Sequence, residues 1–145
     1  MKKVLFVCVQ NSARSQMAEA LLKQHCAEFF EVESCGLKPG TLNPLAVEAM
    51  AEIGLDISQN KTKDIFPFIR VHPTFDYVIT LCDESAGQNC PGFPRTTTQL
   101  QWSFPDPAAF TGTHEERLAR TREVRNAIKA QIQVWCEEVC GVEAA

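Results

Sequence analysis

Residues 3–22 read KVLFVCVQNSARSQMAEALL, and this stretch decides the fold. Residues 3–8 form a largely apolar run that ends in a cysteine, the pattern of a β-strand covered on both faces. Residues 9–14 are mostly small or polar and predict a short loop. From Ser15 onward the apolar residues recur at helical spacing and predict an amphipathic helix. A buried strand, a short loop and a helix together form the opening unit of an α/β fold.

The same alternation continues along the chain. It predicts strands at 30–37, 75–82 and within 96–102, a helix from Pro44 with Asn43 as its N-cap, and a long helix from the Thr113 capping box to Gly141. We therefore expect a single α/β domain over residues 1–145, with a mainly parallel four-stranded sheet flanked by helices.

Composition narrows the class of protein. The net charge is −4, which argues against a nucleic-acid binder, and no apolar stretch approaches the length that spans a membrane. Seven cysteines without an export signal indicate a reducing compartment, because an odd count does not fit a fully paired disulfide framework. We expect a cytoplasmic monomer that binds neither nucleic acid nor membrane.

Cys8 and Arg14 bracket five residues, which is the C-x5-R pattern. In a parallel sheet, ligands bind beyond the carboxyl ends of the strands, and the N–H groups at a helix start attract anions. The pattern therefore predicts an oxyanion site in which Arg14 adds bidentate hydrogen bonds and Ser15 donates to the Cys8 thiolate. The residues predicted to bind the oxyanion are Val9, Gln10, Asn11, Ser12, Ala13 and Arg14.

Two simpler interpretations compete with the oxyanion site. Cys8 can be a buried cysteine at a strand end, with Arg14 as a surface cation; the strand–loop–helix context argues against this. A Cys–His hydrolase is the other, but no histidine forms a local signature with Cys8. The three histidines, His25, His72 and His114, are expected at the surface or in structural roles.

The motif VLFVCVQNSARSQMAEAL resembles the phosphate loop of the low-molecular-weight tyrosine phosphatase fold. Within that fold, RSQMAEA is similar to the thioredoxin-coupled arsenate reductases, since the phosphatases have proline after the serine. NPLAVEAMAEIGLDIS, DYVITLCDESAGQNCP and WSFPDPA match the same family in order. Two positions depart from the family pattern. Gln10 stands where the family usually has glycine, and Ala13 stands where it often has a second cysteine. We expect the loop to close with an altered local geometry at Gln10.

The resemblance implies a three-cysteine relay that reduces arsenate to arsenite. Cys8 is the nucleophile, Cys82 and Cys90 carry the disulfide, and thioredoxin or another thiol reductant restores the enzyme. A helix over 82–90 would hold the two Cα atoms about 12 Å apart, whereas a disulfide tolerates about 7 Å. Residues 83–93 are therefore expected to differ in conformation between redox states. The alternative for Cys82 and Cys90 is that both are buried apolar residues.

The resemblance also assigns supporting residues. It makes Asp106 in FPDPA the general acid, although a turn aspartate is the alternative, and the small residues after it favour an inorganic substrate. No cofactor is expected to be tightly bound, apart from a potassium ion behind the loop at Asn11, Ser15, Glu19, Thr62 and Asp64. The remaining cysteines, Cys26, Cys35, Cys136 and Cys140, are expected to be packing residues.

Two rival functions remain open at this point. A low-molecular-weight protein tyrosine phosphatase would use only Cys8, Arg14 and Asp106. A non-catalytic oxyanion-binding or arsenite-binding protein would need the loop but no general acid.

Overall fold

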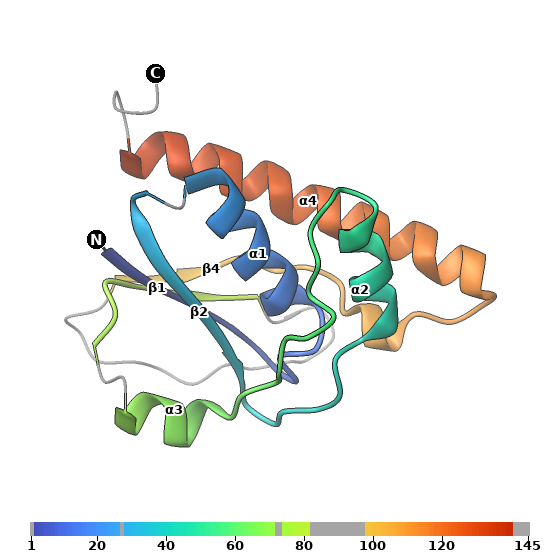
Figure 1. Cartoon of the computed structure of the whole chain (residues 1–145), viewed down its shortest axis with the longest axis horizontal. Helices are drawn as coiled ribbons and strands as arrows, with labels where there is room; N and C mark the ends of the chain where they lie inside the picture. The colour runs from blue at the N-terminus through green and yellow to red at the C-terminus, as the bar shows by residue number, and fades with distance from the viewer. Residues whose placement is uncertain (1, 27, 72–73, 82–97, 141–145) are drawn as a thin grey trace.

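The computed structural model describes residues 2–26, 28–71, 74–81 and 98–140, and Figure 1 shows their arrangement. Four parallel strands form one sheet in the order β2-β1-β3-β4. The strands are β1 (Lys2–Cys8), β2 (Phe30–Gly36), β3 (Tyr77–Thr80) and β4 (Thr98–Gln101). The last pair between β1 and β2 joins Cys8 to Gly36, so both strands end at the same edge. The predicted α/β fold with a four-stranded parallel sheet is confirmed.

Helices cover both faces of this sheet (Figure 1). They are α1 (Arg14–Cys26), α2 (Pro44–Ala51), α3 (Ile65–Val71) and α4 (His114–Cys140), with a short 3-10 helix η2 (Pro107–Ala109). Figure 1 shows α1, α2 and α4 on one face and α3 on the other. Side chains of β1 alternate accordingly: Val4 and Phe6 join the core under α1 and α4, whereas Leu5 and Val7 pack with Ile65 of α3. The apolar run of β1 is therefore buried from both sides.

Two elements differ from the sequence prediction. Helix α3 was not predicted; it begins after Asp64, whose carboxylate accepts a hydrogen bond from the Phe66 amide. The third strand is also shorter than the predicted 75–82 and covers only Tyr77–Thr80. Asp76 instead lies before the ladder, where its carboxylate accepts from the Lys3 amide. The prediction that Cys82 ends this strand falls outside the described residues.

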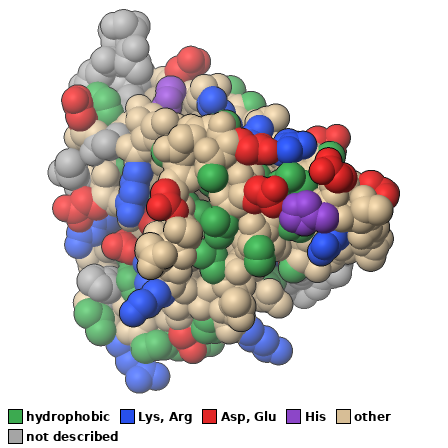
Figure 2. Space-filling view, turned by 45° about the vertical axis from the view of Figure 1, so that its right-hand side comes forward, with side chains coloured by type: hydrophobic (Ala, Val, Ile, Leu, Met, Phe, Trp, Pro, Cys, Tyr) green, Lys and Arg blue, Asp and Glu red, His purple; other side chains and the backbone are tan. Residues whose placement is uncertain are grey.

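Two further features of the described part of the chain concern its helices and its surface charge. None of its helices has the length and apolarity needed to cross a membrane. On the face in Figure 2, acidic and basic side chains are interspersed. A basic stripe of the kind that follows a nucleic-acid backbone is not visible on that face.

Ion pairs connect α4 to Glu52, which caps the C-terminal end of α2. The carboxylate of Glu52 accepts hydrogen bonds from Arg122 at 2.6 and 2.9 Å and from Arg125 at 2.9 Å. The hydrogen bond from Arg122 is the largest cause that lowers the Glu52 pKa from 4.5 to about 2. Glu52 therefore stabilises the fold above about pH 4.5, and this contribution is lost as the pH falls through about 2.

Glu52→Gln is expected to lower the melting temperature at neutral pH. The difference from wild type should shrink between about pH 4.5 and about pH 2, because Glu52 of the unfolded chain is protonated in this range while the folded protein keeps it ionised down to about pH 2. Added salt should also reduce this difference in melting temperature, since the Glu52–Arg122 ion pair is partly exposed. Thermal unfolding from pH 2 to pH 7 is the measurement, with the exposed Glu137→Gln on α4 as the control. A difference that is constant over this range would contradict the assignment.

Candidate active site

The loop between β1 and α1 turns its backbone carbonyls away from Cys8. Four of these oxygens accept hydrogen bonds from the chain after β2, in the pairs Cys8–Leu37 at 3.2 Å, Val9–Lys38 at 2.8 Å, Gln10–Gly40 at 3.0 Å and Ser12–Asn43 at 2.9 Å. A planar trans peptide points its N–H opposite to its C=O. The amides that follow these carbonyls therefore point to the inner side of the loop, where an anion would lie.

Gly36 at the end of β2 allows this close approach. A Cβ atom on Gly36 would lie 2.8 Å from the Asn11 nitrogen, 2.8 Å from the Gln10 carbonyl carbon and 2.9 Å from the Val9 oxygen. All three atoms belong to the backbone, so no side chain can move aside. Glycine is the residue that fits at this contact between β2 and the loop.

The unusual backbone conformation of the loop falls on Asn11. Its φ of 54° makes it the only non-glycine residue with positive φ in the described part of the chain. Asparagine tolerates this left-handed conformation better than most residues. Gln10, where the family has glycine, does not adopt positive φ. Gln10 thus keeps a backbone conformation that ordinary residues adopt, and Asn11 is the left-handed residue of the loop.

The Cys8 sulfur lies inside the loop as a buried, reduced thiol. It accepts a hydrogen bond from the Asn11 amide at 3.2 Å and lies 2.9 Å from the Ser15 hydroxyl. Ser15 also accepts from the Asn11 side-chain amide at 2.7 Å. The Ser15 hydroxyl therefore bridges the Asn11 side chain and the Cys8 sulfur. The sulfur thus lies within hydrogen-bonding distance of the loop backbone and of the first turn of α1.

Arg14 joins three parts of the chain beside Cys8. Its side chain is 2% exposed, and its Nη1 donates to the carbonyls of Leu81 at 3.1 Å and Phe104 at 3.2 Å. Its Nη2 lies 3.1 Å from the carboxylate of Asp106. A buried guanidinium is tolerated only with such partners. Arg14 thus connects the start of α1 to the end of β3 and to the segment after β4.

Asp106 occupies a fixed position next to Arg14. Its second carboxylate oxygen accepts from the Ala108 amide at 3.0 Å, so Asp106 caps the 3-10 helix η2. Pro107 at the first position of η2 fixes the backbone there. The carboxyl group therefore lies at the loop edge, as the motif predicted. A cavity of about 330 Å³ opens on this side; its lining includes Gln10, Ser12, Pro107, Ala108 and Arg117.

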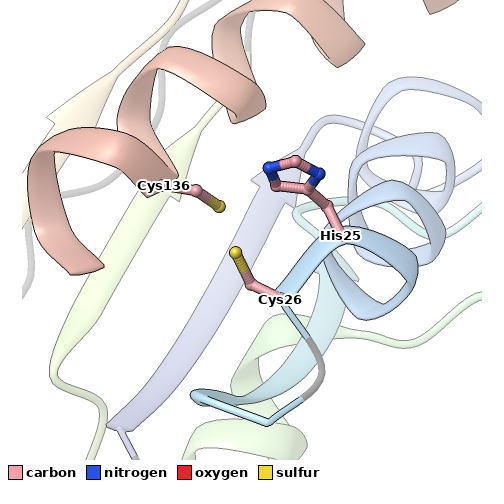
Figure 3. A group of neighbouring side chains, drawn as sticks. All are labelled: His25, Cys26 and Cys136. Atoms are coloured by element: carbon pink, nitrogen blue, oxygen red, sulfur yellow. The ribbon is translucent and has the colours of Figure 1, made fainter. Parts of the chain in front are cut away.

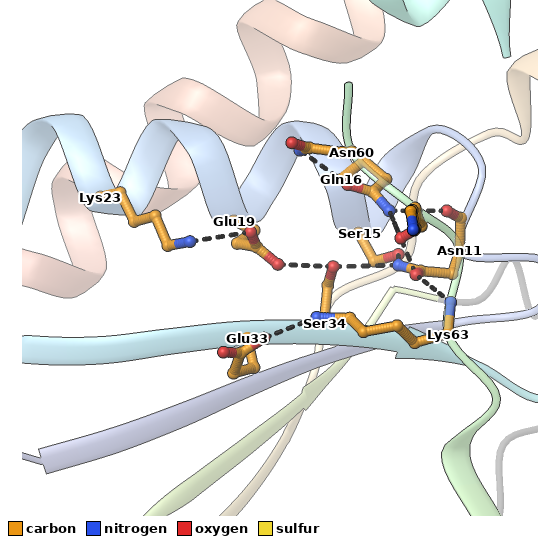
Figure 4. A network of polar contacts seen from close by, with 10 residues as sticks. Asn11, Ser15, Gln16, Glu19, Lys23, Glu33, Ser34, Asn60 and Lys63 are labelled. Carbon is orange, nitrogen blue, oxygen red and sulfur yellow. Dashed lines mark hydrogen bonds and ion pairs between the residues drawn. The ribbon is translucent and has the colours of Figure 1, made fainter. Parts of the chain in front are cut away.

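A buried polar network lies behind the loop, as Figure 4 shows. The Asn11 side chain donates to Ser15 and Ser34, and its oxygen accepts from the Lys63 amide and the Gln16 side chain. The network continues from the Ser34 hydroxyl to Glu19 at 2.7 Å, and from Glu19 to Lys23 at 2.9 Å. Ser34 lies in no sequence motif and was not predicted, and Gln16 was singled out only as the residue that stands where the phosphatases have proline.

The predicted potassium ligands fit this network only in part. Asn11, Ser15 and Glu19 belong to it, but Asn11 turns its NH2 group toward the serines, and an ion there would need the amide oxygen instead. Turning the amide over would break the two hydrogen bonds that its oxygen accepts. Thr62 donates to the Gly40 carbonyl, and Asp64 caps α3. The potassium site stays a prediction of the resemblance, and no step below depends on it.

The structure describes some of the other residues named from the sequence and leaves others outside its described part. Val9, Ser12 and Ala13 lie in the loop as expected. Cys82 and Cys90, with the predicted movement of residues 83–93, lie outside the described residues. His114 pairs with Glu48, 2.9 Å away, so its partner is a carboxylate on α2.

Comparisons with known proteins agree with this geometry. The family described as low molecular weight phosphotyrosine protein phosphatase matches residues 3–141. An arsenate reductase of Shouchella clausii is 41% identical over 94% of this chain and 96% of its own length. A solved arsenate reductase in the phosphate binding state has a TM-score of 0.79 and 35% identity, covering 95% of this chain and 98% of its own.

A third relative is a thioredoxin-dependent arsenate reductase of Corynebacterium glutamicum. It has a TM-score of 0.62 and 30% identity, covering 92% of this chain and 63% of its own. The chain therefore belongs to the low molecular weight phosphotyrosine protein phosphatase family, and within it to the arsenate reductases.

Proposed function

We propose that this protein reduces arsenate to arsenite through a covalent intermediate on Cys8. The observation that carries the proposal is the loop itself: its amides face a buried thiol, and the Arg14 guanidinium lies beside it. Arsenate is a tetrahedral oxyanion of the size that such a loop surrounds. The relative solved in the phosphate binding state supports the same use of the loop.

In the first step the Cys8 thiolate attacks arsenic. An S–As bond forms and an As–O bond breaks, so the leaving oxygen needs a proton. Asp106 is the general acid in this proposal, because its carboxyl group lies beside Arg14 at the mouth of the loop. Arg14 and the loop amides hold the remaining oxygens, and water leaves. The product is a thiol–arsenate adduct in which arsenic is still pentavalent.

In the second step the Cys82 thiolate attacks the Cys8 sulfur. The S–As electron pair stays on arsenic, which is thereby reduced to arsenite, and a Cys8–Cys82 disulfide forms. The Cys90 thiolate then attacks Cys82, so that Cys8 is released and a Cys82–Cys90 disulfide remains. Leu81 supports this order, because its carbonyl binds Arg14 and Cys82 is the next residue in the sequence.

An external dithiol must reduce the Cys82–Cys90 disulfide, since the relay consumes two electrons per arsenate. Thioredoxin is the proposed reductant, by similarity to the thioredoxin-dependent relative. Such a cycle belongs in a reducing compartment, and we propose the cytoplasm.

Turnover in two variants distinguishes the reductase from a phosphatase. Cys82→Ser and Cys90→Ser are expected to abolish steady-state arsenate-dependent oxidation of NADPH with thioredoxin and thioredoxin reductase. Cys90→Ser should still release about one arsenite per chain in a single turnover, because Cys82 can complete the reduction once. The residual hydrolysis of an aryl phosphate should be retained in both variants, since it needs only the loop. Unchanged turnover in either variant would refute the relay and favour the phosphatase.

A further inference from the structure

Three potential metal ligands converge at the end of α1 that is remote from the catalytic loop. Figure 3 shows His25 and Cys26 of α1 beside Cys136 of α4, with the two sulfur atoms directed toward each other. One imidazole nitrogen of His25 and the two sulfurs lie within 4.8 Å of one another. Cys26 and Cys136 are buried and reduced, and His25 is exposed. Since α1 has 13 residues, this cluster lies about 18 Å from Arg14 along the helix.

We propose that His25, Cys26 and Cys136 bind a thiophilic divalent ion of the zinc class. Two thiolates and one imidazole are the donor set that zinc uses when a fourth position stays open to water. A tetrahedral zinc ion with Zn–S bonds of about 2.3 Å places two thiolates about 3.8 Å apart. The present separations within 4.8 Å need shifts of only ~1 Å to reach that geometry.

The surroundings of the cluster admit and favour a cation. A groove of about 300 Å³ between α1 and α4 is lined by Leu21, Gln24, His25, Lys129, Ile132 and Gln133, so that an ion can enter from the His25 side. His25 and Cys26 lie in the last turn of α1, where the helix dipole is negative. The positive charge of Lys129 would repel a bound cation, but Lys129 is exposed and its flexible side chain can extend into solvent.

Binding requires each thiol to lose its proton, so two protons leave to solvent for each ion bound while His25 binds as neutral imidazole. The ion would then link the end of α1 to α4. Because α1 begins at Arg14 beside Cys8, this link would stabilise the helix that carries the catalytic loop. The proposal is independent of the arsenate chemistry, since the two sites share no side chain.

Anaerobic titration with Co²⁺ tests the site. The parent is the Cys8→Ser, Cys82→Ser, Cys90→Ser chain, because the proposed relay thiols would also bind cobalt. Cys35 stays in place, since burial raises its pKa to about 12 and keeps it a protonated thiol. One Co²⁺ per chain should give a near-ultraviolet thiolate-to-cobalt charge-transfer band. Zn²⁺ should displace the cobalt and raise the melting temperature of this parent.

Single ligand variants decide whether the band belongs to this cluster. Cys26→Ser and Cys136→Ser should weaken Co²⁺ binding by about 100-fold or more, and His25→Gln by about 10-fold to 100-fold. His25 is exposed, so its variant should fold even if a buried cysteine variant does not. The matched control is His114→Gln, which should bind like the parent. No band in the parent, or a band that persists unchanged in His25→Gln and both cysteine variants, would overturn the proposal.

Discussion

Replacement of Cys8 by serine is expected to lower arsenate reduction by about 10⁴-fold or more, because a hydroxyl cannot replace a thiolate as nucleophile in this loop. The first turnover should be lost as well, unlike in the Cys90→Ser variant. The residual aryl phosphatase activity should disappear together with it, since both reactions begin at the same sulfur. Rapid-quench measurement of arsenite, in parallel with phosphate release, follows both losses.

The loop itself should survive this change. The hydrogen bonds to the carbonyls of Cys8, Val9, Gln10 and Ser12 come from the backbone of residues 37–43, and serine leaves them intact. Cys8→Ser should therefore still bind phosphate or arsenate, with a Kd within about tenfold of wild type. Cys35→Ala, a buried thiol in the core on the other face of the sheet, is the control and should reduce arsenate normally. Measurable reduction by Cys8→Ser would contradict covalent catalysis at this residue.

The second large effect is expected from Gly36→Ala. The new methyl group would lie 2.8 Å from backbone atoms of Gln10 and Asn11, so either the end of β2 or the loop must move. A displacement of about 1 Å at catalytic atoms typically costs about 10²-fold in rate, and overpacking of this kind costs about 1–3 kcal/mol of stability. Kinetics and denaturant unfolding of the same preparation measure both effects.

Gly40→Ala is the matched control for this prediction. Its methyl group would lie 3.3 Å from the Oε1 atom of the Gln10 side chain, which can move aside. The activity of Gly40→Ala should therefore stay within about threefold of wild type, by comparison with surface substitutions that cost little free energy. If Gly36→Ala were equally active, the close approach of β2 to the loop would have no role in holding the amides.

The sequence predicts well those parts of the protein whose structure is determined by residues close together in the chain. The first strand, the loop and the helix after it follow from apolar periodicity and from the spacing of Cys8 and Arg14. The Asn43 cap and Pro44 mark the start of α2 in the same local way. Asp106 was assigned through the resemblance of its FPDPA motif, and its contact with Arg14 required the fold.

The parts that were missed depend on contacts between distant segments. Ser34 and Gly36 look like ordinary strand residues until β2 is placed beside β1, where they support Asn11 and the loop. Helix α3 was missed because IFPFIRV is short and apolar; its signal was Asp64 as N-cap with a proline in the first turn. Cys136 was predicted to be a packing residue. Its neighbours His25 and Cys26 come from α1, and the sequence alone does not show that they meet.

The outward hydrogen bonds of the loop carbonyls have a consequence for the catalytic cycle. Residues 37–43 bind the loop on one side and β1 leads into it on the other, so the anion site is already formed before any substrate binds. Little reorganisation is then needed when charge develops on the arsenic oxygens. In the proposed relay the disulfide changes partners while these hydrogen bonds hold the loop, so the movement that the relay needs must come from other segments of the chain.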